Sequence, residues 1–265
     1  MDVNRFTFDK WYMDCVESDG RTAIAYRATM AWGPLAFSWQ SVAVYDLLMP
    51  PQVRTSLAIV DAPVHQDRMI RWNAPDLGCA IEAETRQDPA AIRLLENADG
   101  VIDWRCEAPA ATMCMRVQGH EPIRGCGYAE RLILTMLPWR LPIDELRWGR
   151  WIAADASHSM VWIDWRGELP NTWVFVDGVR QHGATAVVRD DAVSAGDCVL
   201  ALSTPRLLET RSLDEIVKPA GALKNLLPAS LLALRETKWC SSGTWRSHGA
   251  EPLSGWAIHE KVSFR

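Results

Sequence analysis

Short motifs in the first half of the sequence return, in the same order, in the second half. Trp11 is followed by the string Ile24-Ala-Tyr-Arg27, and Trp151 is followed at nearly the same spacing by Ile163-Asp-Trp-Arg166. Each half then ends on a glycine, four residues, a glutamate and a basic residue: Gly125-Cys-Gly-Tyr-Ala-Glu-Arg131 and Gly255-Trp-Ala-Ile-His-Glu-Lys261. An ordered repeat of this length predicts a chain built from two copies of one folding unit.

The ends of the repeat set the expected domain boundaries. We predict an N-terminal unit over residues 1–131, a connecting segment over residues 132–149 that contains Pro138 and Pro142, and a C-terminal unit over residues 150–265. A chain of 265 residues is long enough to bury a sizeable core without disulfides or metals.

Strand signals dominate both halves, as β-branched and alternating apolar runs bounded by turn residues such as Gly33-Pro34 and Asp177-Gly178. Helical signal is confined to Pro89–Glu96, where proline precedes good helix formers, and to parts of Ala222–Arg235. We therefore expect an all-β fold of two barrel halves with a few short helices, because closing each sheet removes its exposed edges. The expected strands are Thr22–Trp32, Ala111–Val117, Met160–Trp165, Thr172–Val176, Ala184–Val188, Cys198–Leu202 and Trp256–Phe264.

Tryptophan is unusually abundant, with fourteen Trp against five Phe and four Tyr. An indole ring is large and keeps an N–H donor, so this excess suits either a Trp-rich core or the wall of a cavity for a large apolar ligand. The formal charge of -5 and the lack of a Lys/Arg cluster argue against a nucleic-acid partner. We expect an apolar small molecule as the partner, and the sequence leaves the oligomeric state open.

Several absences narrow the expected location and chemistry. No apolar run reaches the roughly 18 residues of a membrane-spanning helix, and the first residues contain no apolar signal-peptide core. These two absences predict a cytoplasmic protein. The seven cysteines show irregular spacing and no CxxC motif, so we expect most of them to be buried free thiols. The histidines form no HxH or HExxH pair, and no GxSxG, Walker or GxGxxG motif occurs, so we predict no metal and no cofactor.

One set of motifs resembles a known family. Lys10-Trp-Tyr-Met-Asp14, followed by Ser18-Asp-Gly20, resembles the opening strand and turn of the hydroxyneurosporene synthase family, also called the carotenoid 1,2-hydratase or AttH-like lipocalin superfamily. Gly125-Cys-Gly-Tyr-Ala-Glu130 resembles that family's later strand motif. The resemblance implies two lipocalin-like halves and a catalytic role for Tyr128 and Glu130. The family's His-x-Trp motif is matched by Ile102-Asp-Trp104, which keeps the tryptophan and lacks the histidine.

The chemistry open to Glu130 depends on where its side chain points. Residues two apart on a strand share a face, so Tyr128 and Glu130 point the same way. If that face is buried, burial raises the pKa of the carboxyl group, and a neutral acid can protonate an alkene or epoxide to give a tertiary cation. Tryptophan faces stabilise such a cation through their quadrupoles. The alternative is structural: Glu260 holds the same place in the second copy, and a repeated glutamate can serve to pair with a base across the sheet.

Aromatic and acidic residues elsewhere are candidates for substrate contact. Asp103 and Asp164 each lie in an Ile-Asp-Trp-Arg string, where we favour the arrangement with tryptophan facing the core and the acid facing solvent. Trp139, Trp148 and Arg150 near the connection can line a cleft or form an Arg–Trp clasp. The predicted substrate-binding set is Trp104, Trp139, Trp148, Trp162, Asp164 and Trp165.

Three functions remain open on this basis. The leading hypothesis is a cofactor-independent biosynthetic enzyme that protonates an apolar, isoprenoid-like substrate and hydrates or cyclises it. The second is a pericyclase, which needs a pocket that folds the substrate and no acid. The third is a carrier of lipids or pigments that returns its ligand unchanged.

Overall fold

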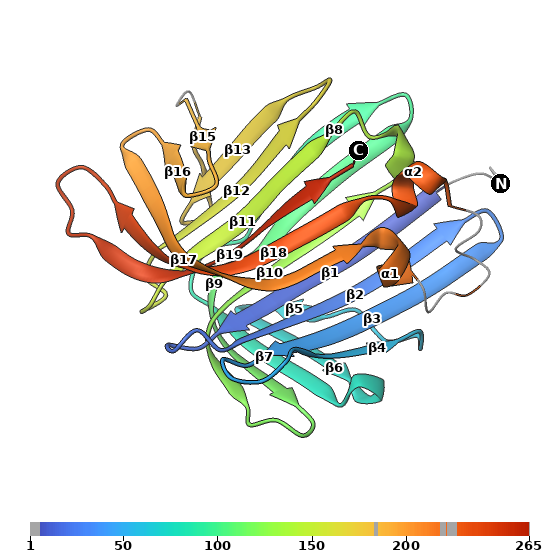
Figure 1. Cartoon of the computed structure of the whole chain (residues 1–265), viewed down its shortest axis with the longest axis horizontal. Coiled ribbons are helices and arrows are strands. Elements are labelled where there is room, and N and C mark those ends of the chain that lie inside the picture. Colours follow the sequence, from blue (N-terminus) through green and yellow to red (C-terminus); the bar gives the residue numbers. More distant parts are fainter. Residues whose placement is uncertain (1–5, 183–184, 218–220, 222–226, 265) are drawn as a thin grey trace. The chain divides into compact units, whose positions relative to one another are not determined.

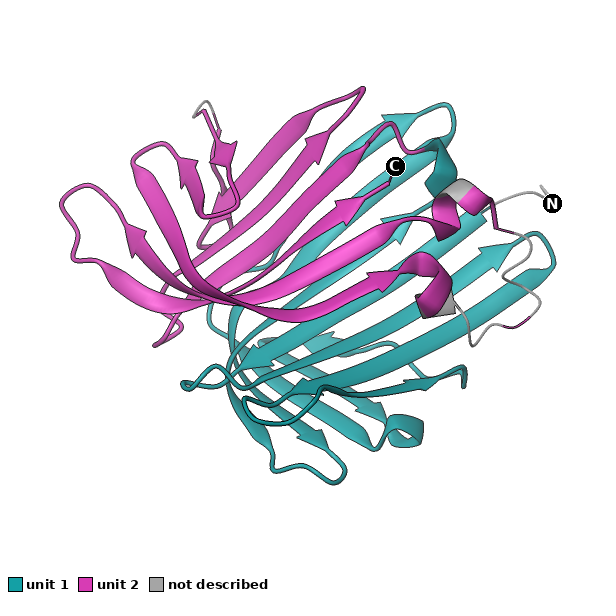
Figure 2. Ribbon diagram, viewed as in Figure 1, with its two compact units in different colours: residues 1–140 teal, residues 141–265 magenta. Residues whose placement is uncertain are grey.

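The computed structural model describes residues 6–182, 185–217, 221 and 227–264. The chain divides into two compact units, residues 1–140 and 141–265, which are described separately below (Figures 1 and 2). The predicted all-β class is confirmed, because each unit consists of one large antiparallel sheet and only short helices. No helix in the described part of the chain is both long and apolar enough to cross a bilayer.

Unit 1 contains a ten-stranded sheet in the order β4-β3-β2-β1-β10-β9-β7-β6-β5, with β8 paired to β9 off this path. Two 3-10 helices, η1 (Pro75–Leu77) and η2 (Pro138–Arg140), accompany it. The strands are β1 (Phe6–Val16), β2 (Thr22–Trp32), β3 (Leu35–Tyr45), β4 (Gln52–Ser56), β5 (Val64–Gln66), β6 (Met69–Ala74), β7 (Cys79–Thr85), β8 (Ala90–Asn97), β9 (Gly100–Val117) and β10 (Ile123–Leu134).

Unit 2 contains a nine-stranded sheet in the order β14-β13-β12-β11-β19-β18-β17-β16-β15. The helices α1 (Leu213–Val217) and α2 (Ala229–Leu232) lie between β17 and β18 in the chain. The strands are β11 (Glu145–Ala153), β12 (Ser159–Arg166), β13 (Asn171–Val176), β14 (Val179–Arg180), β15 (Val187–Val188), β16 (Ala192–Ala195), β17 (Cys198–Ser212), β18 (Arg235–Arg246) and β19 (Leu253–Ser263).

The two sheets follow the same strand order, as the sequence repeat requires. The long strand β17 takes the place of two strands of unit 1, because β7 and β8 both pair with β9 at different heights. Gly125 and Gly255 hold equivalent positions: a Cβ atom on either would lie 2.0 Å from a carbonyl oxygen of the neighbouring strand, that of Val16 or of Ile152. Only glycine allows these close approaches between strands.

The same register corrects one part of the sequence interpretation. Cys15 lies opposite Gly127 and Trp151 lies opposite Ala257, so Trp151 corresponds to Cys15. The expected pairing of Trp151 with Trp11 was therefore wrong by four residues. Ile24 lies opposite Asp14 and Val161 opposite Arg150, so Ile24 corresponds to Val161, and its expected pairing with Ile163 was wrong by two residues. Matching similar residues by their spacing along the chain thus misplaced both of these markers, whereas the closing glycine and glutamate motifs align.

Three further expectations differ from the structure. Residues 90–97 form strand β8 and not a helix, because hydrogen bonds to β9 override the helix propensity of an Ala/Leu-rich run. The segment between the last strand of unit 1 and the first of unit 2 covers residues 135–144. Both sheets are curled but not closed into barrels. Among the described residues, no strand pairing joins the two edge strands of either sheet. Residues 222–226 of the predicted helical region lie outside the described residues. The same is true of Ala184, the first residue of the predicted strand Ala184–Val188.

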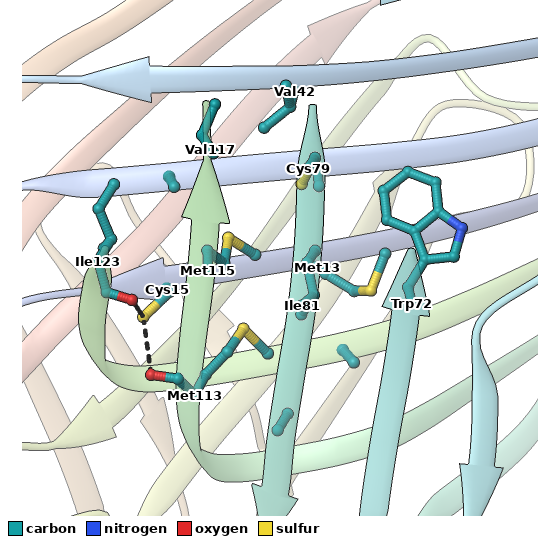
Figure 3. Close-up of a cluster of buried hydrophobic side chains, with 14 of the residues drawn as sticks. Met13, Cys15, Val42, Trp72, Cys79, Ile81, Met113, Met115, Val117 and Ile123 are labelled. Atoms are coloured by element: carbon teal, nitrogen blue, oxygen red, sulfur yellow. Dashed lines mark hydrogen bonds between the residues drawn. The ribbon is translucent and has the colours of Figure 1, made fainter. Parts of the chain in front are cut away.

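Each unit packs its own core on one face of its sheet. In unit 1 this face is filled by methionine, cysteine and small aliphatic side chains, with Met13, Met113 and Met115 fully or almost fully buried (Figure 3). The thiol of Cys15 points to the carbonyl oxygens of Met113 and Ile123 at 3.6 and 3.8 Å. In unit 2 the corresponding cluster is built around Trp151, Trp162 and Trp245.

Candidate functional site

Three of the predicted site residues meet in unit 1. The Tyr128 hydroxyl donates to Oε2 of Glu130 at 2.8 Å, and the Trp104 indole N–H donates to the same oxygen at 2.6 Å. All three side chains are buried, with Glu130 only 5% exposed. Tyr128 and Glu130 flank the core residue Ala129 on β10, so they point to the opposite face of the sheet from the core. Glu130 lies opposite Cys106 on β9, and Trp104 follows on the same face two residues away.

The surroundings of Glu130 hold its neighbours in neutral, proton-donating forms. Burial raises the pKa of Tyr128 well above its ordinary value, and the nearby Cys106 and Glu130 charges act in the same direction. Burial likewise raises the pKa of the Cys106 thiol. Both donors meet Oε2 of Glu130, which therefore acts as the acceptor of two hydrogen bonds.

Aromatic rings lie beside this carboxyl group on the neighbouring strands. Tyr12, opposite Glu130 on β1, is 2% exposed and packs edge-on against Tyr26 with ring centroids 5.2 Å apart. Its ring also lies 6.2 Å from that of Tyr128. Glu130 is thus bounded by tyrosine and tryptophan side chains from β1, β9 and β10.

The equivalent glutamate of unit 2 has a different environment. Glu260 lies opposite Lys238 on β18, where unit 1 has Cys106, and its Oε2 is 2.7 Å from the Lys238 ammonium nitrogen. Lys238 is fully buried and also pairs with Glu236 and Glu209. The position of Tyr128 is taken by Ile258, opposite Arg150 on β11. Glu260 therefore belongs to a buried ion-pair cluster, the structural role that the sequence left open.

Unit 2 also contains a cavity of about 410 Å³ beside its core, with which it shares Trp162 and Val188. The Trp162 ring of this lining packs closely on Gly149, where a Cβ atom would lie 2.1 Å from Cζ2 of the ring. The lining comprises Arg147, Trp148, Trp162, Val188, Arg189, Asp190, Leu202, Pro205, Trp239, His259, Glu260 and Lys261.

One wall of this cavity is a stacked pair of rings. Trp239 and His259 lie opposite each other on β18 and β19, with ring centroids 5.4 Å apart and an angle of 22° between the planes. The Ser241 hydroxyl lies 2.8 Å from Nε2 of His259. Burial lowers the pKa of His259 to about 4, against a smaller opposing effect of Asp190, so the imidazole is neutral near pH 7.

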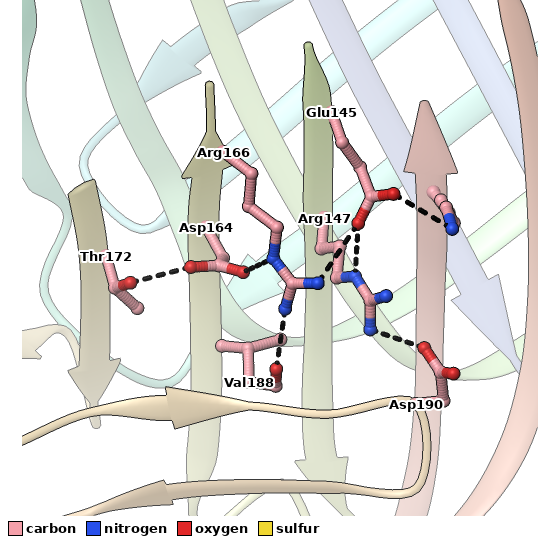
Figure 4. A network of polar contacts seen from close by, with 8 residues as sticks. Glu145, Arg147, Asp164, Arg166, Thr172, Val188 and Asp190 are labelled. Carbon is pink, nitrogen blue, oxygen red and sulfur yellow. Dashed lines mark hydrogen bonds and ion pairs between the residues drawn. The ribbon is translucent and has the colours of Figure 1, made fainter. Parts of the chain in front are cut away.

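A network of charges adjoins the cavity (Figure 4). Glu145 bonds the guanidinium groups of Arg147 at 2.7 Å and Arg166 at 3.2 Å, and the Lys261 ammonium at 2.9 Å. Burial alone would raise the pKa of Glu145, but the hydrogen bonds from Arg147 and Lys261 outweigh it and hold the pKa below its ordinary value. Arg147 also pairs with Asp190.

Asp164 belongs to the same network and corrects the expected orientation. It is 7% exposed, accepts from the Thr172 hydroxyl at 2.6 Å and pairs with Arg166 at 2.9 Å. The expected solvated Asp–Arg face was therefore wrong for Asp164, because ion pairing allows the carboxylate to be buried. Asp103 faces solvent as expected and pairs with Arg93 at the surface, but its neighbour Trp104 points to the face of Glu130 and not to the core.

The six predicted substrate-binding residues are divided between the units, with Trp104 and Trp139 in unit 1 and the other four in unit 2. Trp104 lies at Glu130, whereas Trp148 and Trp162 line the unit 2 cavity. Trp165 packs edge-on against Trp173, on the face opposite Asp164. The remaining residue, Trp139 in η2, packs against Trp32 with ring centroids 5.6 Å apart.

Sequence reasoning missed Tyr12, Cys106, Lys238, Trp239 and His259. One signal was present: Trp239 and His259 are equally distant from Gly249, whose positive φ of 75° marks the turn between β18 and β19. Pairing the strands about that turn would have placed the two rings together. Within the described part of the chain, no group of three or more His, Cys, Asp or Glu side chains is arranged to hold a metal ion.

Comparison with known proteins gives likeness in structure alone. No protein-family model and no curated protein matches the chain. Kievitone hydratase from Nectria haematococca is similar with a TM-score of 0.55 and 8% identity, over 96% of this chain and 88% of that one. An AttH-like protein from Nitrosomonas europaea has a TM-score of 0.54 and 14% identity, over 100% and 94%. CghA in complex with Sch210972 has a TM-score of 0.55 and 12% identity, over 97% and 88%.

These similarities establish the fold. The chain is a nearly all-β protein with two curled, lipocalin-like sheets, so the fold class predicted from the sequence is confirmed. The AttH-like part of the predicted resemblance is matched at the level of structure.

Proposed function

We propose that this protein is a cofactor-independent enzyme that hydrates or cyclises an apolar, isoprenoid-like substrate by acid catalysis at Glu130. One observation carries the proposal: Glu130, Tyr128 and Trp104 form a single buried hydrogen-bonded group. These are the positions that the resemblance to the hydratase family marks. A hydratase among the proteins of similar fold supports an enzymatic role.

The geometry suggests how each residue would act. Tyr128 and Trp104 hold Oε2, and Oε1 delivers its proton to one carbon of a substrate double bond, which leaves a tertiary cation on the other carbon. The neighbouring rings of Tyr12 and Trp104 stabilise that cation. In hydration, water adds to the cation and its proton returns to the Glu130 carboxylate. In cyclisation, a second double bond attacks the cation and the proton lost afterwards returns to Glu130, so the product is an isomer.

The compartment of this enzyme is proposed to be the cytoplasm. All seven cysteines are free, with Cys15, Cys79, Cys106 and Cys240 buried. Free thiols in this number are typical of a reducing compartment.

The proposal is tested by incubating the full chain with polyprenyl alcohols and related chains in H₂O and in D₂O, followed by mass analysis of the recovered ligand. We expect a product heavier by one water, or an isomer, that carries deuterium at the protonated carbon when made in D₂O. Glu130→Gln keeps the shape of the side chain and removes the acid, so it should lower turnover by about 10²–10⁴-fold. Unlabelled product, formed equally well by Glu130→Gln, would instead favour a pericyclase.

A further inference from the structure

We propose that the cavity of unit 2 is a second ligand-binding site, which takes a neutral, flat and mainly apolar ring compound bearing one hydroxyl or carbonyl group. Its volume of about 410 Å³ falls in the usual range for small-molecule sites. Every residue that lines it belongs to unit 2. The inference therefore does not depend on acid catalysis at Glu130.

The preference for a flat ring follows from the aromatic surfaces of the cavity. The Trp162 indole forms one of them, held against the backbone at Gly149. The stacked rings of Trp239 and His259 form the other. Rings gain about 0.5–1.5 kcal/mol from stacked or edge-on contacts with other rings, beyond the area that they bury. Val188 and Leu202 add aliphatic surface.

The preference for a neutral ligand follows from the charges around the cavity. Arg147 and Lys261 both pair with Glu145, and Arg147 also pairs with Asp190. Glu260 pairs with the buried Lys238. The remaining cation of the lining, Arg189, is exposed to solvent. A charged ligand would have to displace one of these partners and lose its own hydration, whereas a neutral ligand leaves the network intact.

The preference for a hydroxyl or carbonyl group follows from His259. Its Nε2 is bonded to Ser241, and Nδ1 has no hydrogen-bond partner among the residues that the structure describes. A neutral imidazole donates or accepts at Nδ1 according to its tautomer, so it can bind an oxygen in either role. One oriented polar group in an apolar, aromatic cavity is typical of sites for small organic ligands.

Naphthol is a suitable probe, because it is neutral, flat and bears one hydroxyl group. We expect the full chain to bind it saturably at one site, measured by calorimetry and by quenching of tryptophan fluorescence. Naphthoate, which has the same rings and a negative charge, should bind at least tenfold more weakly. Equal or tighter binding of naphthoate would overturn the preference for a neutral ligand.

Variants locate the site. Trp239→Leu should weaken naphthol binding at least tenfold, whereas Trp32→Leu, which removes an indole from unit 1, should leave it unchanged. His259→Phe keeps a ring for stacking and removes the ring nitrogens. The variant should therefore bind naphthol no more tightly than it binds naphthalene, which has no hydroxyl group. Leu202→Trp fills the cavity while keeping its aromatic walls, so it should abolish naphthol binding. This variant tests the site even where Trp239→Leu fails to fold.

The same titrations separate this inference from the proposed function. Glu130→Gln should bind naphthol with native affinity, even though it is expected to lose turnover. Absence of saturable binding by the native protein, or native affinity in folded Leu202→Trp, would overturn the second site.

Discussion

One stretch of the core face is built differently in the two units. Four corresponding positions on the core face are Met13, Ala25, Ala108 and Ala129 in unit 1 and Gly149, Trp162, Trp239 and His259 in unit 2. In unit 1 these side chains are fully buried in a close-packed cluster. In unit 2 the three rings line a cavity of about 410 Å³, and Trp162 lies against Gly149. Flexible methionines fill irregular gaps, whereas rigid rings leave space between their planes.

The opposite faces of the same sheets show a second divergence. Glu130 accepts hydrogen bonds from the neutral donors Tyr128 and Trp104, whereas Glu260 pairs with the ammonium group of Lys238. A salt bridge favours the ionised carboxylate, which cannot serve as an acid. The duplicated glutamate thus has neutral hydrogen-bond donors as partners in unit 1 and a cation in unit 2.

The largest effect on stability is expected from Lys238→Met. Lys238 is fully buried and compensates Glu209, Glu236 and Glu260, so its removal leaves carboxylates without their shared cation. Such a change costs about 3–5 kcal/mol of unfolding free energy. Chemical denaturation measures it, with Cys106→Ala, at the corresponding position of unit 1, as the matched control. A loss for Lys238→Met no greater than that of the control would contradict a structural role for the Glu260 ion pair.

Trimming one side chain in each unit sharpens the comparison between the packed cluster of unit 1 and the cavity of unit 2. Met113→Ala removes a buried side chain from the packed core of unit 1 and should cost about 2–5 kcal/mol. Leu202→Ala trims a half-buried side chain that already borders the cavity of unit 2. The loss of unfolding free energy for Leu202→Ala, measured by thermal or urea unfolding, should be at most about half of the loss for Met113→Ala. Equal costs would mean that the unit 2 cavity is filled by its own side chains in solution.

A smaller, pH-dependent effect is expected from His259. Its pKa is about 4 in the folded protein against 6.5 for the free side chain, so the unfolded chain binds more protons between these values. Unfolding free energy should therefore fall as pH is lowered from 6.5 to about 4, by at most about 1.4 kcal/mol per pH unit. In His259→Phe this component should be absent. Other charged groups, Asp190 among them, lie near His259. The pH profile of His259→Phe is therefore subtracted from that of the native protein.

Local patterns in the sequence located some of the strands and brought the residues of the acid cluster together. Strand β2 has the predicted bounds, Thr22 and Trp32, because its turn residues are explicit. Tyr128 and Glu130 share a face because of the period of a strand, and the resemblance added Trp104. These features depend on residues that are close in sequence or on motifs with fixed spacing.

The cavity depends on pairing between strands, which local patterns do not specify. The rings of Trp239 and His259 meet because of the register between β18 and β19, and Trp162 lies over Gly149 for the same reason. β9 and β10 also shift register near Ala129, so the heights of their side chains could not be counted from the sequence. Residues 90–97 became a strand because a partner was available, against their local propensity.

The most direct test of the account is to compare Glu130→Gln with Glu260→Gln under identical conditions. Both variants remove the same charge from equivalent strands, and turnover of a polyprenyl substrate is measured on folded protein at 25 °C, where both are first shown to be folded by circular dichroism. The account predicts a loss of at least 10²-fold for Glu130→Gln, with turnover by Glu260→Gln remaining near native while its stability falls. Equal turnover by the two variants would contradict acid catalysis at Glu130.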